Sequence, residues 1–261
     1  MAPLRILLTA DLHGRLSREQ AARLREAREN YGALLLDAGD ALTAPNVLVW
    51  PWDEPVLRRM NEAGYDAMTL GNREFFFRRR GLERKTRPAG FPVVAANLRR
   101  RDGGEARAPA ALLETAAGER VGVIGLAREM IAPGSAEERC SDLRFVPWRE
   151  AAREAAERLR PAVAWLVALS HLGPEADEEL ARLCPELDLV LGGHAHPRET
   201  LVRRVGGAHA RRTTVVTAAA YLREVALITS AQPQSPSEFT VERLEVGAQF
   251  IVPHSGGERA Q

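Results

Sequence analysis

The chain has 261 residues, 45% of them hydrophobic, and its 36 basic and 35 acidic residues leave a formal charge of +1. This length can bury a large core and no Pro/Gly/Ser-rich linker divides it, so we predict one domain over residues 1–252 and a polar tail at 253–261. A nearly neutral chain has no overall field for nucleic acid or anionic membranes, and no apolar run approaches the roughly 20 residues that cross a bilayer, so we expect neither partner.

Strands and helices alternate through the first two thirds of the chain. Compact apolar runs predict strands at residues 4–9, 33–36, 67–70, 92–96, 111–114, 121–125, 163–169 and 187–191. Helical patterns with start or stop signals predict helices at residues 17–30, 54–63, 148–159 and 174–183, the first of them opened by a capping pattern of Ser17 and Gln20. Residues 99–108 are polar and contain glycine, which predicts an exposed hairpin or loop.

The last third of the chain changes character. Residues 213–217, 224–230 and 239–245 predict strands without long helices between them, and residues 231–237 form a polar, proline-containing connection. Helices early and a meander of strands late predict an α/β fold in which two sheets pack together and carry helices on their flanks.

Five of the predicted strands are followed directly by side chains that bind divalent metals. These side chains are Asp11, His13, Asp40, Asn72, His171, His194 and His196. In sheets with strand-to-helix connections, ligand residues gather beyond the carboxyl ends of the strands, so donors that are far apart in sequence can converge. Taken singly, an aspartate at the end of a strand is commonly a helix cap, and a histidine there is commonly a polar residue with its hydrogen bonds satisfied. Five such segments in order, however, predict a site for two metal ions.

Asp40 is the natural bridging ligand, because the Gly-Asp turn presents it alone. Asp11, His13 and one later histidine would complete the first ion, and Asn72, His171 and the remaining histidine would complete the second. Such a pair of ions is held roughly 3.5–4 Å apart in phosphoester hydrolysis. Glycines at positions 39, 71, 192 and 193 permit the sharp turns and close backbone approach that crowded metal loops need.

The donor set contains only nitrogen and oxygen. Such donors favour manganese, iron, zinc, cobalt or nickel over copper(I) or an iron–sulfur cluster, and we predict two manganese ions. Two clustered divalent cations would acidify a bridging water and neutralise the charge of a phosphoryl transition state. The donors therefore predict hydrolysis.

The order Asp-x-His, Gly-Asp, Gly-Asn-x-Glu, Ser-His-Leu-Gly and Gly-His-x-His resembles the calcineurin-like metallophosphoesterases. Residues 91–98, 121–126 and 187–196 make the chain similar, more narrowly, to the catalytic domain of 5′-nucleotidases, and the resemblance covers residues 4–230. It implies a four-layer α/β/β/α sandwich with two mixed sheets, and hydrolysis of a nucleotide-like monoester or diester by a metal-bridging hydroxide.

The resemblance also assigns the ligands. It implies that Asp11, His13, Asp40 and His196 hold one metal, and that Asp40, Asn72, His171 and His194 hold the other. It places Arg73, Asp40 and His171 in the catalytic set and Asn72, Arg73 and Asn97 against the substrate, with a hydrogen-bonding role in a turn as the alternative for Asn97. Nucleotidases of this type carry a C-terminal domain that stacks the base, and we expect none here, so nucleoside specificity is not carried over.

The chain departs from the family at the residues that handle the leaving group. Family members usually carry a histidine after the asparagine, and nucleotidases add an aspartate three residues later to orient it. Here these positions are Arg73 and Phe76. Arginine stays protonated, so Arg73 can bind phosphate but cannot supply a proton, and losing a general acid typically costs about 10²–10⁴-fold in rate.

Two further segments have open interpretations. Residues 78–87 hold six basic residues in ten, which predicts either a solvated face or a rim that attracts a polyanionic substrate. Trp50 and Trp52 predict either a stacking wall for a substrate or a hydrophobic anchor for a long loop. His209 and His254 have no partners by spacing, and we interpret them as surface residues.

Our first hypothesis is a metal-dependent phosphoesterase that acts on a small phosphorylated substrate, with Arg73 as phosphate clamp. The alternative is a catalytically impaired, metal-containing protein that binds a phosphorylated ligand in a regulatory or scaffolding role, and a third is hydrolysis of a sulfur oxyanion ester. The first residues lack the features of a secretory signal, and Cys140 and Cys184 stand apart without metal-binding spacing, so we expect a cytoplasmic protein. Nothing in the sequence indicates an oligomeric state.

Overall fold

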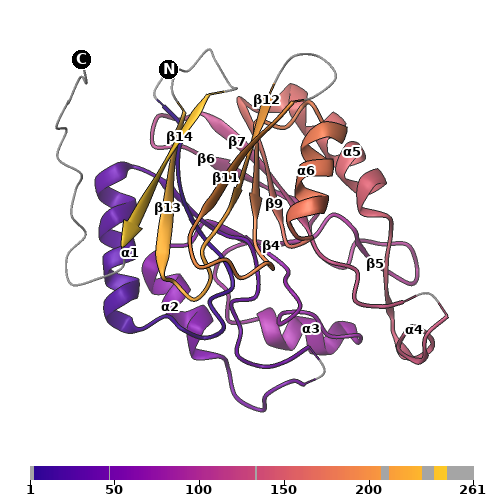
Figure 1. Ribbon diagram of the computed structural model, residues 1–261. Coiled ribbons are helices and arrows are strands. Elements are labelled where there is room, and N and C mark those ends of the chain that lie inside the picture. Colours follow the sequence, from indigo (N-terminus) through magenta and orange to yellow (C-terminus); the bar gives the residue numbers. More distant parts are fainter. Residues whose placement is uncertain (1–2, 47, 133, 207–211, 231–237, 246–261) are drawn as a thin grey trace, which may run out of the picture.

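Two six-stranded sheets lie face to face in the part of the chain that the structure describes (Figure 1). The computed structural model describes residues 3–46, 48–132, 134–206, 212–230 and 238–245. His209, His254, the predicted connection at 231–237 and the predicted tail at 253–261 lie outside these residues.

Each sheet draws its strands from distant parts of the chain. In spatial order, the first sheet contains β14 (Phe239–Glu245), β13 (Glu224–Ser230), β1 (Arg5–Thr9), β2 (Leu34–Asp37), β3 (Ala67–Thr69) and β4 (Val93–Val94). The second contains β11 (Leu201–Gly206), β12 (Arg212–Thr217), β10 (Leu189–Gly192), β9 (Trp165–Ser170), β7 (Arg120–Leu126) and β6 (Ala110–Glu114). A small antiparallel ribbon pairs β5 (Leu98–Arg100) with β8 (Leu143–Phe145).

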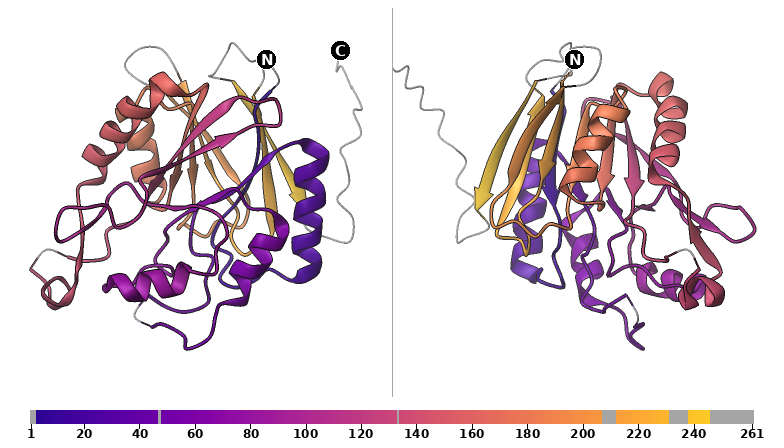
Figure 2. Two further views of the ribbon diagram at one scale, coloured as in Figure 1. Left: turned by 180° about the vertical axis from the view of Figure 1, so that it is seen from behind. Right: turned by 45° about the vertical axis from the view of Figure 1, so that its right-hand side comes forward.

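Helices cover the outer faces of both sheets. The helices beside the first sheet are α1 (Arg18–Tyr31), α2 (Pro55–Ala63) and α3 (Arg79–Thr86). Those beside the second sheet are α5 (Trp148–Leu159), which a short 3-10 turn (Arg160–Ala162) follows, and α6 (Pro174–Leu183). The short helix α4 (Ala136–Cys140) lies before β8. Figure 2 shows both helical layers from behind, with α1 on one side of the sheets and α5 and α6 on the other.

The period-two alternation of the strands explains these layers. In β1, Ile6 and Leu8 face the second sheet and belong to the same buried cluster as its Val167. Leu7, between them, faces outward and belongs to the cluster that includes Leu24 of α1. Because both faces of each sheet are apolar, each sheet must pack against the other sheet on one face and against helices on the other. The predicted four-layer α/β/β/α sandwich is confirmed.

The local signals for helix ends are also confirmed. The Ser17 hydroxyl accepts a hydrogen bond from the Gln20 amide (3.1 Å), and the Gln20 side chain accepts one from the Ser17 amide (2.8 Å), which completes the predicted capping box. Helix α2 ends at Gly64, whose left-handed backbone lets its N–H bond to the last turn. Among the described residues, no helix is both long and apolar enough to span a membrane.

The local predictions outside the central strands had mixed outcomes. The predicted strand at 92–96 forms only two residues of ladder. The predicted exposed hairpin or loop at 99–108 is confirmed as a hairpin: it begins with strand β5, and the Arg100 amide donates to the Gly104 carbonyl (2.7 Å). Strand β11 was not predicted, because it is an edge strand with an almost wholly exposed sequence that does not alternate between apolar and polar residues, and pairing with β12 defines it.

The basic segment at 78–87 contains helix α3, which was not predicted either. Its Lys85 side chain is buried, and the ammonium donates to the carbonyls of Pro45 (2.9 Å) and Phe75 (3.2 Å). Arg84 forms an ion pair with Asp53. The interpretation as a solvated face is therefore wrong for Lys85, because carbonyls of two neighbouring loops satisfy its charge.

Candidate metal centre

The strand order brings the seven predicted donors to one edge of the two sheets. Strands β1, β2 and β3 are parallel neighbours, and so are β9 and β10 in the other sheet. Their carboxyl ends therefore point the same way within each sheet, and the loops that follow them meet. Two hydrogen bonds join the sheets at this edge: the His194 amide donates to Asp11 Oδ2 (2.9 Å), and the His171 ring Nδ1 lies 2.7 Å from the carbonyl oxygen of Ala38.

Most of these donors sit in a strained backbone conformation. Asp11, His13, Asp40, His194 and His196 all have φ between 46° and 73°, in the left-handed region that residues other than glycine rarely adopt. Such strain persists only where the surrounding structure imposes it, and it gathers at functional sites. The five residues are thus held where their side chains meet, at a cost in backbone energy.

Close approach of the turns explains two of the predicted glycines. A Cβ at Gly39, whose φ is 93°, would lie 2.7 Å from the backbone nitrogen of Gly71, and a Cβ at Gly71 would collide with the Asp40 carboxylate. The two turns can therefore pack against each other only because both positions are glycine.

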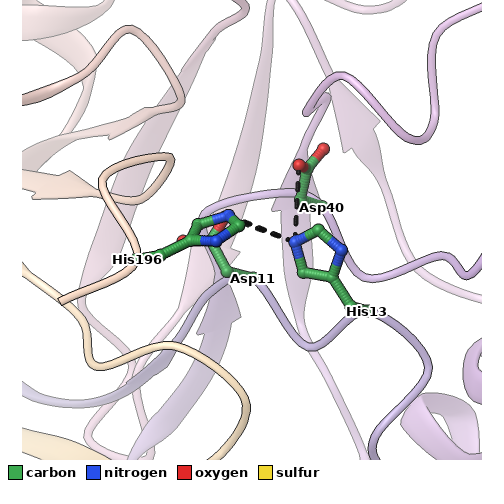
Figure 3. Close-up of side chains that lie close together, drawn as sticks. All are labelled: Asp11, His13, Asp40 and His196. Carbon is green, nitrogen blue, oxygen red and sulfur yellow. Dashed lines mark hydrogen bonds and ion pairs between the residues drawn. The ribbon is translucent and has the colours of Figure 1, made fainter. Parts of the chain in front are cut away.

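Four of the donors form a compact cluster (Figure 3). The ligand atoms of Asp11, His13, Asp40 and His196 all lie within 4.8 Å of one another. His196 Nε2 is 3.0 Å from Asp11 Oδ1 and 3.2 Å from His13 Nε2, and His13 Nε2 is 3.7 Å from Asp40 Oδ2. This is the set that the family resemblance assigns to the first metal.

The other donors also lie around Asp40. His171 Nε2 is 3.6 Å from Asp40 Oδ2, and the rings of His171 and His194 are 5.1 Å apart. Because the Nδ1 of His171 faces a carbonyl, its N–H is directed there, and the Nε2 faces Asp40. Asn72 joins the same cavity as Asp40 and His194. Asp40 Oδ2 thus lies close to a donor of each group, at 3.7 Å from His13 and 3.6 Å from His171, as a bridging ligand requires.

Three buried atoms in this cluster fit a cation better than any protein partner. Asp11 Oδ1, Asn72 Oδ1 and His171 Nε2 have no hydrogen-bond partner among the described residues, and the contact of Asp11 with His196 is close but not aligned as a hydrogen bond. Burial raises the pKa of the fully buried Asp11. An unpaired buried carboxylate is costly unless a cation balances it. The donor set therefore fits a dinuclear divalent metal site.

The charge states of the donors also suit metal binding. Burial lowers the pKa of His13 and of His194 to about 4, so both rings are neutral near pH 7 and offer lone pairs. Burial opposes ionisation of Asp40, but the His171 ring, 3.6 Å away, outweighs burial and lowers the pKa of Asp40. The same partnership raises the pKa of His171 against the effect of burial. The buried carboxylates that favour a proton on His171 would equally attract a divalent cation.

Glu74 is a buried support that the sequence interpretation gave no role. Its carboxylate accepts hydrogen bonds from the backbone amides of Asp40 (2.9 Å), Leu42 (3.0 Å) and Gly71 (2.8 Å). It therefore ties the Asp40 turn to the Asn72 turn. The signal was present in the sequence, because Glu74 is the glutamate of the Gly-Asn-x-Glu pattern.

Tyr221 and Arg128 were missed for a different reason. The Tyr221 hydroxyl lies 3.1 Å from His196 Nδ1, and Arg128 Nη1 lies 3.0 Å from His194 Nε2. Both residues follow strands of ordinary composition, and only the fold brings them to the histidines. No local pattern could have identified them.

A cavity of about 340 Å³ opens above the donors. Its lining residues are His13, Asp40, Pro45, Asn46, Asn72, Arg73, His194 and His196. The Arg73 amide donates to Asp40 Oδ1 (2.7 Å), and its guanidinium donates to the carbonyl of Thr43 (2.7 Å). Phe76 packs beside Phe77, with ring centres 4.6 Å apart. The position from which family members orient the catalytic histidine therefore carries no carboxylate.

Asn97 does not line this cavity. Its side chain is fully buried, donates to the Ala127 carbonyl (2.7 Å) and accepts from the Ala127 amide (3.0 Å). This matches the alternative of a hydrogen-bonding role, and a role in substrate binding stays a prediction. Trp50 and Trp52 stack on each other, with ring centres 5.3 Å apart and Trp52 62% exposed. Neither tryptophan lines the cavity.

The fold and the donor cluster together define a class of protein. The chain matches the family model of the calcineurin-like phosphoesterases over residues 4–198, and it belongs to that family. The resemblance that the order of its donor segments predicted is therefore confirmed.

More particular likenesses lie among the 5′-nucleotidases. The chain is 36% identical over 179 residues to a probable 5′-nucleotidase of Treponema pallidum (strain Nichols), covering 64% of this chain and 29% of that protein. It is 31% identical over 196 residues to a snake venom 5′-nucleotidase of Gloydius brevicauda, covering 71% and 32%. The crystal structure of a 5′-nucleotidase precursor from Thermus thermophilus matches with a TM-score of 0.77 at 26% identity, over 93% of this chain and 54% of that one. The chain thus spans about a third of the length of these curated relatives.

Proposed function

We propose that this chain is a metal-dependent phosphoesterase in which Arg73 binds the substrate phosphate where family members use a histidine. The observation that carries the proposal is the set of buried, unpartnered ligand atoms beneath an open cavity that Arg73 also lines. A catalytic site that had lost its function would be expected to lose ligands as readily as the proton donor, and here all seven donors are present.

The metals would be held by two groups of ligands that share Asp40. These are Asp11, His13, Asp40 and His196 for one ion, and Asp40, Asn72, His171 and His194 for the other. Two divalent cations, manganese in our proposal, supply Lewis-acid charge that makes water more acidic and neutralises a phosphoryl group. The nitrogen and oxygen donors support manganese but equally suit iron, zinc, cobalt or nickel.

The residues of the chain position the phosphate for hydrolysis. A water oxygen bonds to phosphorus and gives up a proton, the bond from phosphorus to the ester oxygen breaks, and that proton or one from another water can pass to the leaving oxygen. Arg73 donates one N–H to the Thr43 carbonyl, and its remaining N–H groups can bind phosphate oxygens. Because the guanidinium keeps its proton, the leaving group must take one from water or leave as the anion.

The substrate class follows from the family likeness and the cavity. Relatives of this chain are named 5′-nucleotidases, and we propose a small phosphate ester of nucleotide-like size, either a monoester or a diester. A cavity of about 340 Å³ is within the usual range for small-molecule sites. A location in the cytoplasm remains our proposal, supported by the sparse cysteine content alone.

One observation favours the alternative function. Arg73 and Phe76 occupy the positions of the proton donor and its orienting carboxylate, which suits a protein that binds a phosphorylated ligand without turning it over. Such a protein would use the same metal ions and the same arginine, in a regulatory or scaffolding role.

A substrate panel separates the two functions. The purified chain, loaded with manganese, is assayed for phosphate release from nucleoside monophosphates, sugar phosphates, aryl phosphates and bis-aryl phosphodiesters. Turnover of any ester above the rate of the metal-free protein supports the phosphoesterase. Calorimetric binding of a phosphate ester with no turnover on the whole panel would establish the alternative instead.

A further inference from the structure

Tyr221 is fixed against the metal centre by three contacts. Its amide donates to the Asp11 carbonyl (3.0 Å), its hydroxyl lies 3.1 Å from His196 Nδ1, and its ring centre is 5.3 Å from that of His13. Tyr221 and the following Leu222 both have positive φ, of 64° and 53°, which is rare for two consecutive residues without a glycine. The strained backbone therefore sets the ring beside the first metal position.

Two arginines pack on this ring. The guanidinium carbon of Arg15 lies 4.3 Å from the Tyr221 ring centre, and that of Arg223 lies 5.1 Å from it. Both contacts are within the range of a cation–π interaction. Arg15 follows His13 by two residues, and Arg223 follows Tyr221 by two, so both arginines come from the loops that build the metal centre.

Neither guanidinium is neutralised by a carboxylate in the described part of the chain. Both side chains are exposed, and neither forms a hydrogen bond or ion pair with any residue that the structure describes. Several other arginines are paired, as Arg84 is with Asp53 and Arg203 is with Glu178. Two cations on one aromatic ring repel each other, and an anion between them would relieve that repulsion.

The nearby residues add to this positive potential. Arg73 lines the cavity and Arg128 contacts His194, and neither arginine forms an ion pair with a described carboxylate. The carboxylates within the centre itself are Asp11 and Asp40, both buried metal ligands. A phosphate held at Arg73 therefore leaves the Arg15–Arg223 pair without an anion.

We propose that Arg15 and Arg223 form a second anion subsite, with Tyr221 as its platform, for substrates that carry a second phosphate beside the one that is cleaved. The inference rests on the proposed function and names its substrate class: small diphosphates or bisphosphates rather than simple monoesters. Tyr221 is the positioning residue, because both arginines pack on its ring and the same side chain contacts His13 and His196.

The first test compares two substrates that differ by one phosphate. Phosphate release from adenosine monophosphate and adenosine diphosphate is measured with excess manganese, for the unchanged chain, for Arg15→Ala/Arg223→Ala and for the double lysine variant. We expect the ratio of kcat/KM for the diphosphate to that for the monophosphate to fall about tenfold or more in the alanine variant, and less in the lysine variant, which keeps the charge.

The matched control is Arg120→Ala. Arg120 is exposed, begins strand β7 and therefore lies at the sheet edge away from the donor loops. It should leave the ratio unchanged. Equal falls for both substrates in the Arg15→Ala/Arg223→Ala variant, or no fall for either, would overturn the subsite.

A binding measurement keeps the subsite separate from the proposed function. The melting temperature of the manganese-loaded protein is followed with methylenediphosphonate, a diphosphate analogue that resists hydrolysis, and with methylphosphonate, which has one phosphonate. We expect greater stabilisation by the diphosphonate, and loss of the excess in the double alanine variant. If no ester is turned over while this excess is present and lost as expected, the hydrolase function fails and the anion subsite stands. If the unchanged chain shows no excess, the subsite fails.

Discussion

The metal cage and the turn beside it differ in how fully they are built. In the cage, five residues adopt a left-handed backbone and Glu74 binds three amides to hold two turns together. In the adjacent turn, Arg73 and Phe76 stand where family members carry an acid and its orienting carboxylate. The comparison teaches that binding charge and supplying a proton are separate tasks, carried by separate parts of the loop. This chain has the residues for binding charge. Mutation and the choice of substrate can measure how far it has lost the ability to protonate a leaving group.

The largest effect is expected at the shared ligand of the cage. Asp40→Asn removes the charge that faces both His13 and His171, so we expect turnover to fall about 10³-fold and the bound metal to fall below two ions per chain. Asp102→Asn, in an exposed loop, is the matched control. Metal content and kcat/KM measured side by side decide the result, and unchanged values for Asp40→Asn would remove Asp40 from the centre.

The next largest effect concerns the leaving group. Since Arg73 cannot protonate an alkoxide, aryl esters should be cleaved about 10²–10⁴-fold faster than alkyl esters of similar size. The measurement is kcat across a series of esters graded by the pKa of the leaving alcohol. Arg73→His should narrow the gap, less than fully because Phe76 cannot orient the new ring, whereas Arg73→Gln should not. Equal rates for both ester types in the unchanged chain would show that another group supplies the proton.

A smaller effect is expected beneath the cage. Glu74→Gln replaces an oxygen that accepts backbone amides with an NH₂ group that cannot, so one amide of the two turns loses its partner. We expect metal affinity to fall about 10–100-fold, as for other groups that orient ligands. Titration with manganese and detection by calorimetry measure this loss. The exposed Glu114→Gln is the control, and a Glu74→Gln variant of native affinity would contradict the supporting role.

Removing one hydroxyl should have a modest effect. Tyr221→Phe keeps the ring that carries Arg15 and Arg223 but removes the contact with His196 Nδ1. A single neutral hydrogen bond corresponds to a loss of roughly threefold to tenfold in metal affinity. Tyr31→Phe on helix α1 serves as control. An unchanged affinity would mean that His196 is oriented without Tyr221.

The smallest effect on activity, with a clear effect on stability, is expected at Asp177. Burial raises the pKa of this carboxyl to about 7, against a usual value of 3.8, and the Ser170 hydroxyl donates to it. Between these two pH values the unfolded chain releases its proton while the folded chain keeps it. The free energy of unfolding therefore falls as pH rises from about 4 to 7, by up to about 4 kcal/mol, and stays lower above that.

Asp177→Asn cannot ionise, so the variant should lack this loss. Melting temperatures of the metal-free protein at pH 5, 6, 7 and 8 measure the difference between variant and unchanged chain, which should grow with pH up to about 7 and then level off. A difference that does not depend on pH would show that Asp177 is ionised throughout.

The interior of the fold was largely predictable because its signals are local. Apolar runs marked the central strands of both sheets, and the capping box at Ser17 and the glycine at position 64 marked helix ends. Elements without such local signals were not predicted. Strand β11 has an exposed sequence without apolar alternation and forms because it can pair with the edge of β12. The charge of Lys85 suggested that its side chain is solvated, although carbonyls of two loops accept hydrogen bonds from it.

The sequence by itself predicted the seven candidate donors and the architecture, because a strand followed at once by a metal-binding side chain is a pattern of neighbouring residues. Only the tertiary structure decided how the donors meet. The contact between Asp11 and His196 joins residues 185 positions apart, and it requires parallel strands of two different sheets to end at one edge. Tyr221, Arg15 and Arg223 carry no motif at all. Their role depends on a strained backbone and on distances between loops, and such long-range contacts are fixed by packing rather than by local preference.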